Sequence, residues 1–119
     1  MDGLHIRAGR AGDTVVLHIT GCLDLRTRGR LADFVEGVLP DDGKVVLDLG
    51  EVTLCDATSM STLINIAGRC RARGGWLRIA APAGIVAHAF AVVGFGQAVP
   101  VYATAAAAVA GDETGRIKD

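Results

Sequence analysis

In the first third of the chain, the apolar residues follow first the pattern of a β-strand and then the spacing of an α-helix. A β-branched run over residues 15–19 comes after a turn signal and predicts a strand that ends at Thr20 and Gly21. From Leu25 onward the apolar residues fall at the i, i+3, i+4, i+7 spacing that places them on one helical face. These residues are Leu31, Phe34, Val35 and Val38. Turn-forming residues over 39–43 end the predicted helix.

The same alternation continues through residues 44–80. Residues 44–49 form a short apolar run, typical of a central strand covered on both faces, and residues 50–56 extend it less regularly. A second helix is expected after Asp56, ending at 73–75, and residues 76–80 predict a further strand. The apolar face of this second helix is expected to consist of Met60, Leu63, Ile64 and Ala67.

The last part of the chain predicts a helix, a short strand and another helix. Residues 99–102 can form the strand, and Thr104 is a suitable N-cap for an alanine-rich helix over 105–110. The preceding helix ends near Gly94, and its apolar residues are Ile85, Val86, Ala89, Phe90 and Val93.

This order of elements predicts a single α/β domain with a mixed, largely parallel sheet of four to five strands and about four helices. We assign the domain to residues 1–110 and expect residues 111–119, which are mostly polar, to form a flexible C-terminal tail. Functional groups of such sheets gather at the carboxyl ends of the strands. Two segments are expected to reach such an end, residues 21–24 and residues 54–59.

Composition and charge narrow the classes of function. The formal net charge is -1, without the strongly basic face that direct nucleic-acid binding requires. Neither a signal-peptide pattern nor an apolar run of roughly 20 residues is present, so we expect a cytoplasmic protein without membrane contact. The odd number of cysteines, with no CxxC spacing, predicts reduced thiols at Cys22, Cys55 and Cys70 rather than a disulfide framework.

The sequence offers little for catalysis. No phosphate-binding loop of the GxxxxGK type occurs, and His5, His18 and His88 stand singly without a second ligand at helical spacing. Asp48 lies in an apolar strand, with no histidine or second carboxylate at a catalytic spacing along the chain, and is read as a hydrogen-bonded structural aspartate. We therefore expect no enzymatic activity, no metal and no cofactor.

Several segments, in their order along the chain, resemble the STAS domain family. Residues 45–60, with Leu47-Asp48-Leu49 and then Asp56-Ala57-Thr58-Ser59-Met60, look like the family's strand, loop and Asp-Ser-Ser-Gly-hydrophobic helix start. Residues 21–24 resemble its Gly-Glu-hydrophobic-Asp motif, residues 72–79 its helix-to-strand turn, and residues 92–95 the end of its third helix. The resemblance extends over roughly residues 4–110, and the order of the motifs makes it specific.

The resemblance implies a bacterial anti-sigma factor antagonist. Such a protein binds an anti-sigma factor that is also a serine/threonine kinase, releases a sigma factor, and is switched off by phosphorylation, which a phosphatase can reverse. Carried over by position, the acceptor falls on Thr58, preceded by Asp56. Two positions depart from the pattern, because Ser59 replaces a glycine and Cys22 replaces a glutamate, so Ser59 stays an alternative acceptor. The implied partner-binding residues are Cys22, Leu23, Asp24, Cys55, Asp56, Ala57, Thr58, Ser59 and Met60.

Elementary electrostatics supports a switch at Thr58. A phosphate at the first turn of a helix meets unpaired backbone N–H groups and the positive end of the helix dipole, and it adds about -1.5 to -2 charge beside Asp56. The alternative is that the Thr58 or Ser59 hydroxyl only caps the helix. Two other functions stay open: a STAS subunit of a stressosome-like or lipid-transport assembly without a phosphoswitch, and, less favoured, a phosphoryl-accepting enzyme that uses Asp56 or Asp48.

Overall fold

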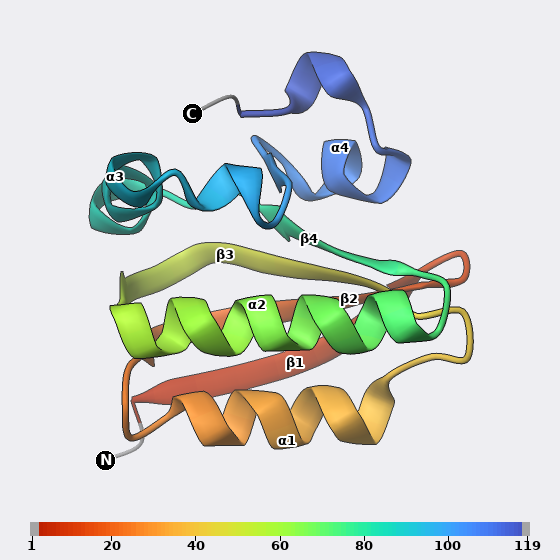
Figure 1. The fold of residues 1–119 in the computed structure, drawn as a ribbon, viewed down its shortest axis with the longest axis horizontal. Helices are drawn as coiled ribbons and strands as arrows, with labels where there is room; N and C mark the ends of the chain where they lie inside the picture. Colours follow the sequence, from red (N-terminus) through yellow and green to blue (C-terminus); the bar gives the residue numbers. More distant parts are fainter. Residues whose placement is uncertain (1–2, 118–119) are drawn as a thin grey trace.

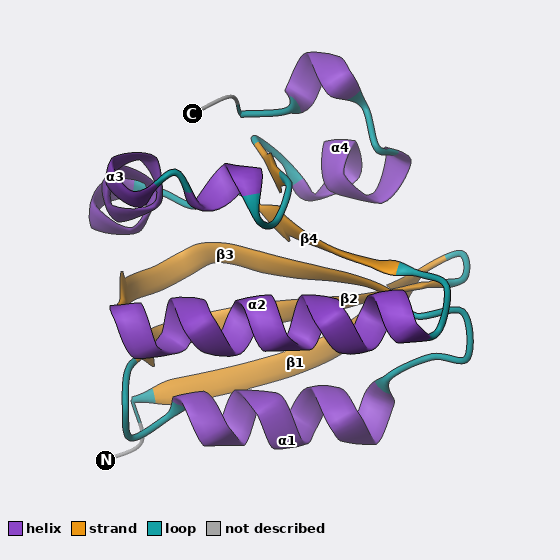
Figure 2. Cartoon of the chain, in the orientation of Figure 1, coloured by secondary structure: helices purple, strands orange, loops and turns teal. Residues whose placement is uncertain are grey.

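The computed structural model describes residues 3–117, which fold into five strands and four α-helices (Figures 1 and 2). None of the helices within these residues combines the length and the apolar character needed to cross a membrane. In chain order, the elements are β1 (Leu4–Ala11), β2 (Thr14–Leu23), α1 (Arg28–Val38), β3 (Lys44–Cys55), α2 (Ala57–Ala72), β4 (Trp76–Ala80), α3 (Gly84–Val93), β5 (Val101–Tyr102) and α4 (Ala105–Ala110).

The five strands form one sheet in the order β1-β2-β3-β4-β5, in which only the β1–β2 pair is antiparallel. Helices α1, α2 and α3 pack on one face through a core that contains Leu17, Leu47 and Ile79 from three neighbouring strands. Helix α4 covers part of the opposite face, over Val46 and Tyr102. Figure 1 shows α1 and α2 side by side across the sheet, both beginning at the same end of the molecule. The predicted α/β class, with a mixed and largely parallel sheet, is confirmed.

The structure extends the predicted sheet at two places. Strand β1 has no counterpart among the predicted elements, although Leu4 lies in the core and Ile6 packs against it. The regular strand predicted over residues 44–49 continues as β3 through the less regular segment to Cys55, with register shifts in the β2–β3 pairing. Its inward side chains in this extension include Val52, which is 4% exposed.

The predicted apolar faces of two helices are partly wrong. On α2, Ile64 is 41% exposed, whereas Leu63 is fully buried. The buried stripe of this helix runs through Met60, Leu63, Ala67 and Cys70, and Ile64 lies about 100° from Leu63 around the helix axis. On α3, Ile85 and Val93 are likewise exposed, at 66% and 61%, while Val86 and Phe90 carry the packing.

The segment expected to be a flexible tail has a defined conformation over residues 111–117. A 3-10 turn forms at Glu113–Gly115, and the Ile117 amide donates to the Val101 carbonyl at 2.8 Å. The Ile117 side chain packs against the main core, so an apolar residue in a polar segment ties it to β5. Residues 118–119 of the expected tail lie outside the described residues.

Arg78 joins the sheet to α4. Its guanidinium lies over the Trp76 ring, 3.6 Å from the centroid, and Nη1 donates to the Ala108 carbonyl at 2.9 Å. A cation at this position meets the unpaired carbonyls at the negative end of α4 and stacks on the face of the indole. The predicted N-cap of the same helix is confirmed, since the Thr104 hydroxyl accepts from the Ala107 amide at 3.0 Å.

Candidate functional site

The two segments singled out in the sequence meet at one edge of the sheet. Strands β2 and β3 are parallel neighbours, and their last residues, Leu23 and Cys55, are register partners. The backbone amide of Asp56 then donates to the Leu23 carbonyl at 3.1 Å. The parallel pairing therefore brings residues 21–24 beside residues 54–59, as expected for the carboxyl ends of adjacent strands.

Asp56 is the N-cap of α2. Its carboxylate accepts from the Ser59 amide at 2.9 Å and from the Thr58 hydroxyl at 2.7 Å. The Thr58 hydroxyl is thus a donor to the cap and not itself the cap, so the capping alternative considered from the sequence is wrong for both Thr58 and Ser59. The hydrogen bond from Thr58 lowers the pKa of Asp56, partial burial opposes this, and the Ser59 amide lowers it further. The carboxylate is ionised at neutral pH and holds the Thr58 side chain half-buried at the first turn.

We expect Asp56→Ala to destabilise the fold by about 0.5–2 kcal/mol at neutral pH, because the cap and the Thr58 hydrogen bond are lost together. Since the folded pKa of Asp56 lies below its ordinary value of 3.8, this stabilisation is complete above that pH and is lost as the pH falls through the folded pKa. The difference from the wild type should therefore shrink in urea melts below about pH 4. Asp33→Ala, an exposed carboxylate on α1, is the matched control. Equal stability of Asp56→Ala and wild type at neutral pH would contradict the capping role.

Asp24 shapes the neighbouring loop. Its carboxylate accepts from the backbone amides of Arg26 and Thr27, at 2.9 and 3.2 Å, and forms an ion pair of 3.4 Å with the Arg26 side chain. The buried Thr27 hydroxyl closes the loop by donating to the Cys22 carbonyl at 2.7 Å. Although partial desolvation raises the pKa of Asp24, the hydrogen bonds from Arg26 and Thr27 and the Arg26 charge lower it overall. The loop therefore holds an ionised carboxylate, paired with Arg26, at the edge of the sheet where Asp56 begins α2.

The backbone at position 21 explains why residues 21–24 begin with a glycine. The φ of Gly21 is +111°, and a Cβ atom there would clash with the Gly3 carbonyl group. Only glycine adopts this backbone and allows the chain at the start of β1 to approach so closely. The Cys22 amide donates to the same carbonyl at 2.5 Å, so the residue before β1 fixes the end of β2, directly before Asp24.

The predicted partner-binding residues divide into two groups by burial. The side chains of Leu23, Cys55, Ser59 and Met60 are at most 9% exposed, so, contrary to the prediction, they do not belong to a docking surface. Those of Cys22, Asp24, Asp56, Ala57 and Thr58 are exposed or half-buried and stay in it.

Two apolar side chains beside this edge were missed from the sequence. Leu25 is 64% exposed and Leu54 is 41% exposed. Leu25 looked like the beginning of the first helix, but α1 begins only at Arg28, because Asp24 and Thr27 build a turn before it. We define the switch face as Cys22, Asp24, Leu25, Leu54, Asp56, Ala57 and Thr58.

The three cysteines are free thiols. Cys22 and Cys55 lie on neighbouring strands, but Cys22 pairs in register with the exposed Leu54, and Cys55 pairs with the buried Leu23. Successive residues of a strand point to opposite faces, so the two sulfur atoms lie on opposite sides of the sheet. Burial raises the pKa of Cys55 to about 12, and burial raises that of Cys70 to about 11. Neither buried thiol is poised for redox chemistry.

Asp48 does have a histidine partner, contrary to the prediction from the sequence. The Nδ1 atom of His18 lies 3.1 Å from the Asp48 carboxylate, and the Gly50 amide donates to the same carboxylate at 3.0 Å. The two residues are 30 positions apart and meet only because they are register partners in β2 and β3. The expected hydrogen bonding of Asp48 is confirmed, and the pair lies on the sheet face opposite α1 and α2, away from Thr58.

Comparison with known proteins adds a family match. The family model described as "Mlab, STAS domain" matches residues 6–102. No curated protein sequence matches the chain.

Solved structures show the same fold at low sequence identity. An anti-sigma factor antagonist from Mycobacterium paratuberculosis has a TM-score of 0.80 at 17% identity, over 92% of this chain and 94% of that chain. The Bacillus anti-sigma factor antagonist SpoIIAA in its unphosphorylated form has a TM-score of 0.73 at 15% identity, over 92% of this chain and 97% of that chain. The murine anion transporter Slc26a9 matches with a TM-score of 0.73 at 15% identity, over 91% of this chain but 19% of its own.

Proposed function

Because the chain belongs to the STAS domain family, whose model matches residues 6–102, we propose that it is an anti-sigma factor antagonist of the bacterial cytoplasm. It binds an anti-sigma factor with serine/threonine kinase activity through the switch face and thereby releases a sigma factor. Phosphorylation of Thr58 ends this binding. The observation that carries the proposal is the Thr58 hydroxyl, half-buried at the start of α2 and hydrogen-bonded to the Asp56 carboxylate at 2.7 Å.

This geometry supports the following proposed phosphoryl transfer. The Thr58 oxygen forms a bond to the γ-phosphorus of ATP, the bond from that phosphorus to the bridging oxygen breaks, and ADP leaves. The hydroxyl proton passes to Asp56, the acceptor that it already contacts. The kinase supplies ATP, so this chain needs no cofactor and no catalytic activity of its own.

The added charge changes the switch face more than the fold. Asp24 and Asp56 already place carboxylates on this face, and a phosphate on Thr58 adds about -1.5 to -2 charge beside them. A partner that fits the unmodified face, with its exposed Leu25 and Leu54, is then repelled. SpoIIAA has also been solved in a phosphorylated form, which is that relative's own state and supports the same kind of switch here.

Burial favours Thr58 over Ser59 as the acceptor. The Ser59 side chain is 1% exposed, and its hydroxyl has no hydrogen-bond partner among the described residues. A kinase could reach it only after the first turn of α2 unwinds. Ser59 stands where the family pattern has glycine. Because this position is buried, only a small residue fits there.

The test is phosphate mapping. The purified protein is incubated with candidate anti-sigma kinases and ATP, and the phosphorylated residue is identified by mass spectrometry. We expect one phosphate at Thr58, stable to acid as a phosphothreonine, and no labelling of Thr58→Ala. Labelling of Ser59 or of the exposed Ser61 would overturn the assignment of the acceptor, and an acid-labile phosphate would indicate an aspartyl phosphate instead.

A second candidate keeps the switch face but not the phosphorylation. The matching family model carries the description "Mlab, STAS domain", and the anion transporter Slc26a9 contains the same fold as a small part of a longer chain. In this alternative the chain is a STAS subunit of another assembly. Stable partner binding that no kinase treatment weakens would favour it.

A further inference from the structure

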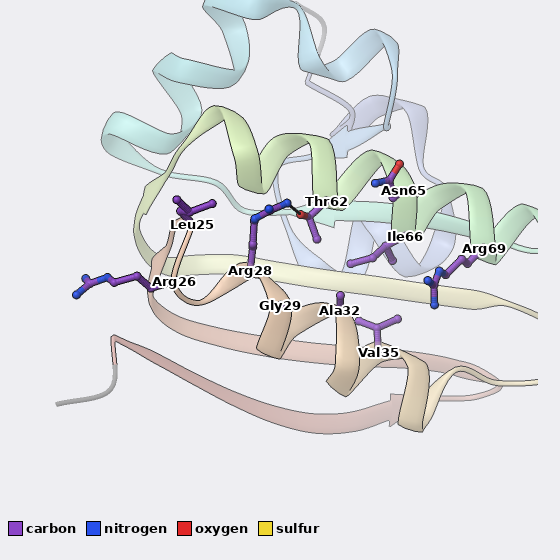
Figure 3. Close-up of a pocket in the computed structure, with 10 residues that line it drawn as sticks. All are labelled: Leu25, Arg26, Arg28, Gly29, Ala32, Val35, Thr62, Asn65, Ile66 and Arg69. Carbon is purple, nitrogen blue, oxygen red and sulfur yellow. Dashed lines mark hydrogen bonds between the residues drawn. The ribbon is translucent and has the colours of Figure 1, made fainter.

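A groove between α1 and α2 lies next to the switch face. Its volume is about 440 Å³, and Figure 3 shows its apolar floor at Ala32, Val35 and Ile66. Three arginines line its rim, Arg26, Arg28 and Arg69. Leu25 belongs to the switch face and also lines the groove, so the two surfaces are continuous.

The three guanidinium groups differ in their partners. Arg69 is held by both carboxylate oxygens of Glu36, at 2.5 and 2.7 Å, and Arg26 pairs with Asp24. Arg28 instead donates to the Thr62 hydroxyl at 3.4 Å, as Figure 3 shows. Among residues 3–117 no carboxylate forms an ion pair with Arg28.

A further anion would be favourable beside Arg28, because the Asp24 carboxylate at this end of α1 is already bound by Arg26 and Thr27. Arg28 is the first residue of α1, where the helix dipole is positive, and no acidic residue occupies the first turn. Its side chain is half-buried between two helices. An anion in this part of the groove would offset both the guanidinium charge and the dipole.

Thr58 lies one helical turn before Thr62, the residue that Arg28 contacts. The Thr62 hydroxyl, which Arg28 contacts, donates to the Thr58 carbonyl at 3.1 Å. Residues four apart on a helix share a face, with their Cβ atoms about 5–6 Å apart. Helices α1 and α2 begin at the same end of the molecule and pack against each other (Figure 1). Arg28 at the start of α1 therefore lies opposite the first two turns of α2, where its side chain reaches Thr62 (Figure 3).

We infer that the Arg28 end of this groove is an intramolecular phosphate-binding site, which receives the phosphoryl group of Thr58 once it is attached. The inference rests on the proposed phosphorylation of Thr58. The guanidinium exchanges its weak contact with the Thr62 hydroxyl for charge-assisted hydrogen bonds to phosphate oxygens. The pair offsets the repulsion between the phosphate and Asp56, so the modified first turn stays folded while the switch face changes charge.

Phosphorus NMR on the full chain tests the site. Phosphothreonine is introduced at position 58 during translation, so that no kinase is needed, and the second ionisation of the phosphate is followed against pH. A nearby guanidinium favours the dianion, so we expect Arg28→Gln to raise the phosphate pKa by about 0.5–1 unit above that of the otherwise unaltered phosphoprotein. Arg28→Lys should give an intermediate value, because it keeps the charge but not the fork of donors.

Arg71→Gln is the matched control, since it removes an exposed arginine from the last turn of α2, the helix that carries Thr58. It should leave the phosphate titration unchanged. Circular dichroism of each phosphoprotein shows whether the variant is folded. If Arg28→Gln does not fold, the comparison is made with Arg28→Lys instead. Equal titration of Arg28→Gln and the unaltered phosphoprotein, or an equal shift in Arg71→Gln, would overturn the site. Failure of every kinase to label Thr58 would instead contradict the proposed function and leave this measurement intact.

Discussion

Thr58→Ala is expected to keep the affinity for the anti-sigma partner, and Thr58→Glu is expected to weaken it by about tenfold or more. The alanine variant leaves the switch face uncharged at this position. The glutamate variant places a third carboxylate beside Asp24 and Asp56 and imitates part of the phosphate charge. Calorimetric titration with the cognate anti-sigma factor measures both affinities under one salt concentration, because exposed charges are screened by salt.

Stability should fall little in either Thr58 variant. The Thr58 hydroxyl contributes one hydrogen bond to Asp56, worth about 1 kcal/mol, and the Asp56 cap on the Ser59 amide is retained. Urea melts of the two variants serve as the control that any difference in binding is not a difference in folding. Equal affinities of Thr58→Ala and Thr58→Glu would argue against charge control of this face.

The largest loss of stability is expected for Leu63→Ala, at about 2–5 kcal/mol. The Leu63 side chain is fully buried between α2 and the sheet, and its truncation leaves a cavity in the main core. Against a typical total stability of about 5–15 kcal/mol, this is a large fraction. The midpoint of urea unfolding should fall clearly, with little change in the slope.

Ile64→Ala is the matched control for Leu63→Ala, because it removes a side chain of similar size from the next position of the same helix. Ile64 is 41% exposed, so we expect a loss below about 1 kcal/mol. A cost for Ile64→Ala equal to that for Leu63→Ala would show that α2 is rotated relative to the sheet. The pair therefore tests the orientation of the helix that carries Thr58.

Local sequence signals predicted most elements of the fold. The strand Trp76–Ala80, the helix Ala105–Ala110 and the end of the third helix at Gly94 depend on apolar runs and caps that act over a few residues. The exact buried face of a helix depends instead on where the sheet lies. Ile64 fits helical spacing as well as Leu63 does, and only packing against the strands separates them.

The site was predictable only in part for the same reason. The pairing of residues 21–24 with 54–59 follows from parallel strands, which the alternation of elements implies. The His18–Asp48 contact depends on the register of β2 against β3, and the groove at Arg28 depends on how α1 lies against α2. The spacing of residues along the chain predicts neither the His18–Asp48 contact nor the groove.

The junction at Arg78 gives the molecule a built-in optical reporter. Trp76 is the only tryptophan of the chain, and its ring lies under the guanidinium that holds the end of α4. It pairs with Lys44 at the beginning of β3, whereas the switch face forms where that strand ends. Indole emission therefore follows the attachment of the C-terminal helix separately from events at Thr58, so one fluorescence trace can distinguish a binding variant from a variant that loosens the opposite end of the sheet.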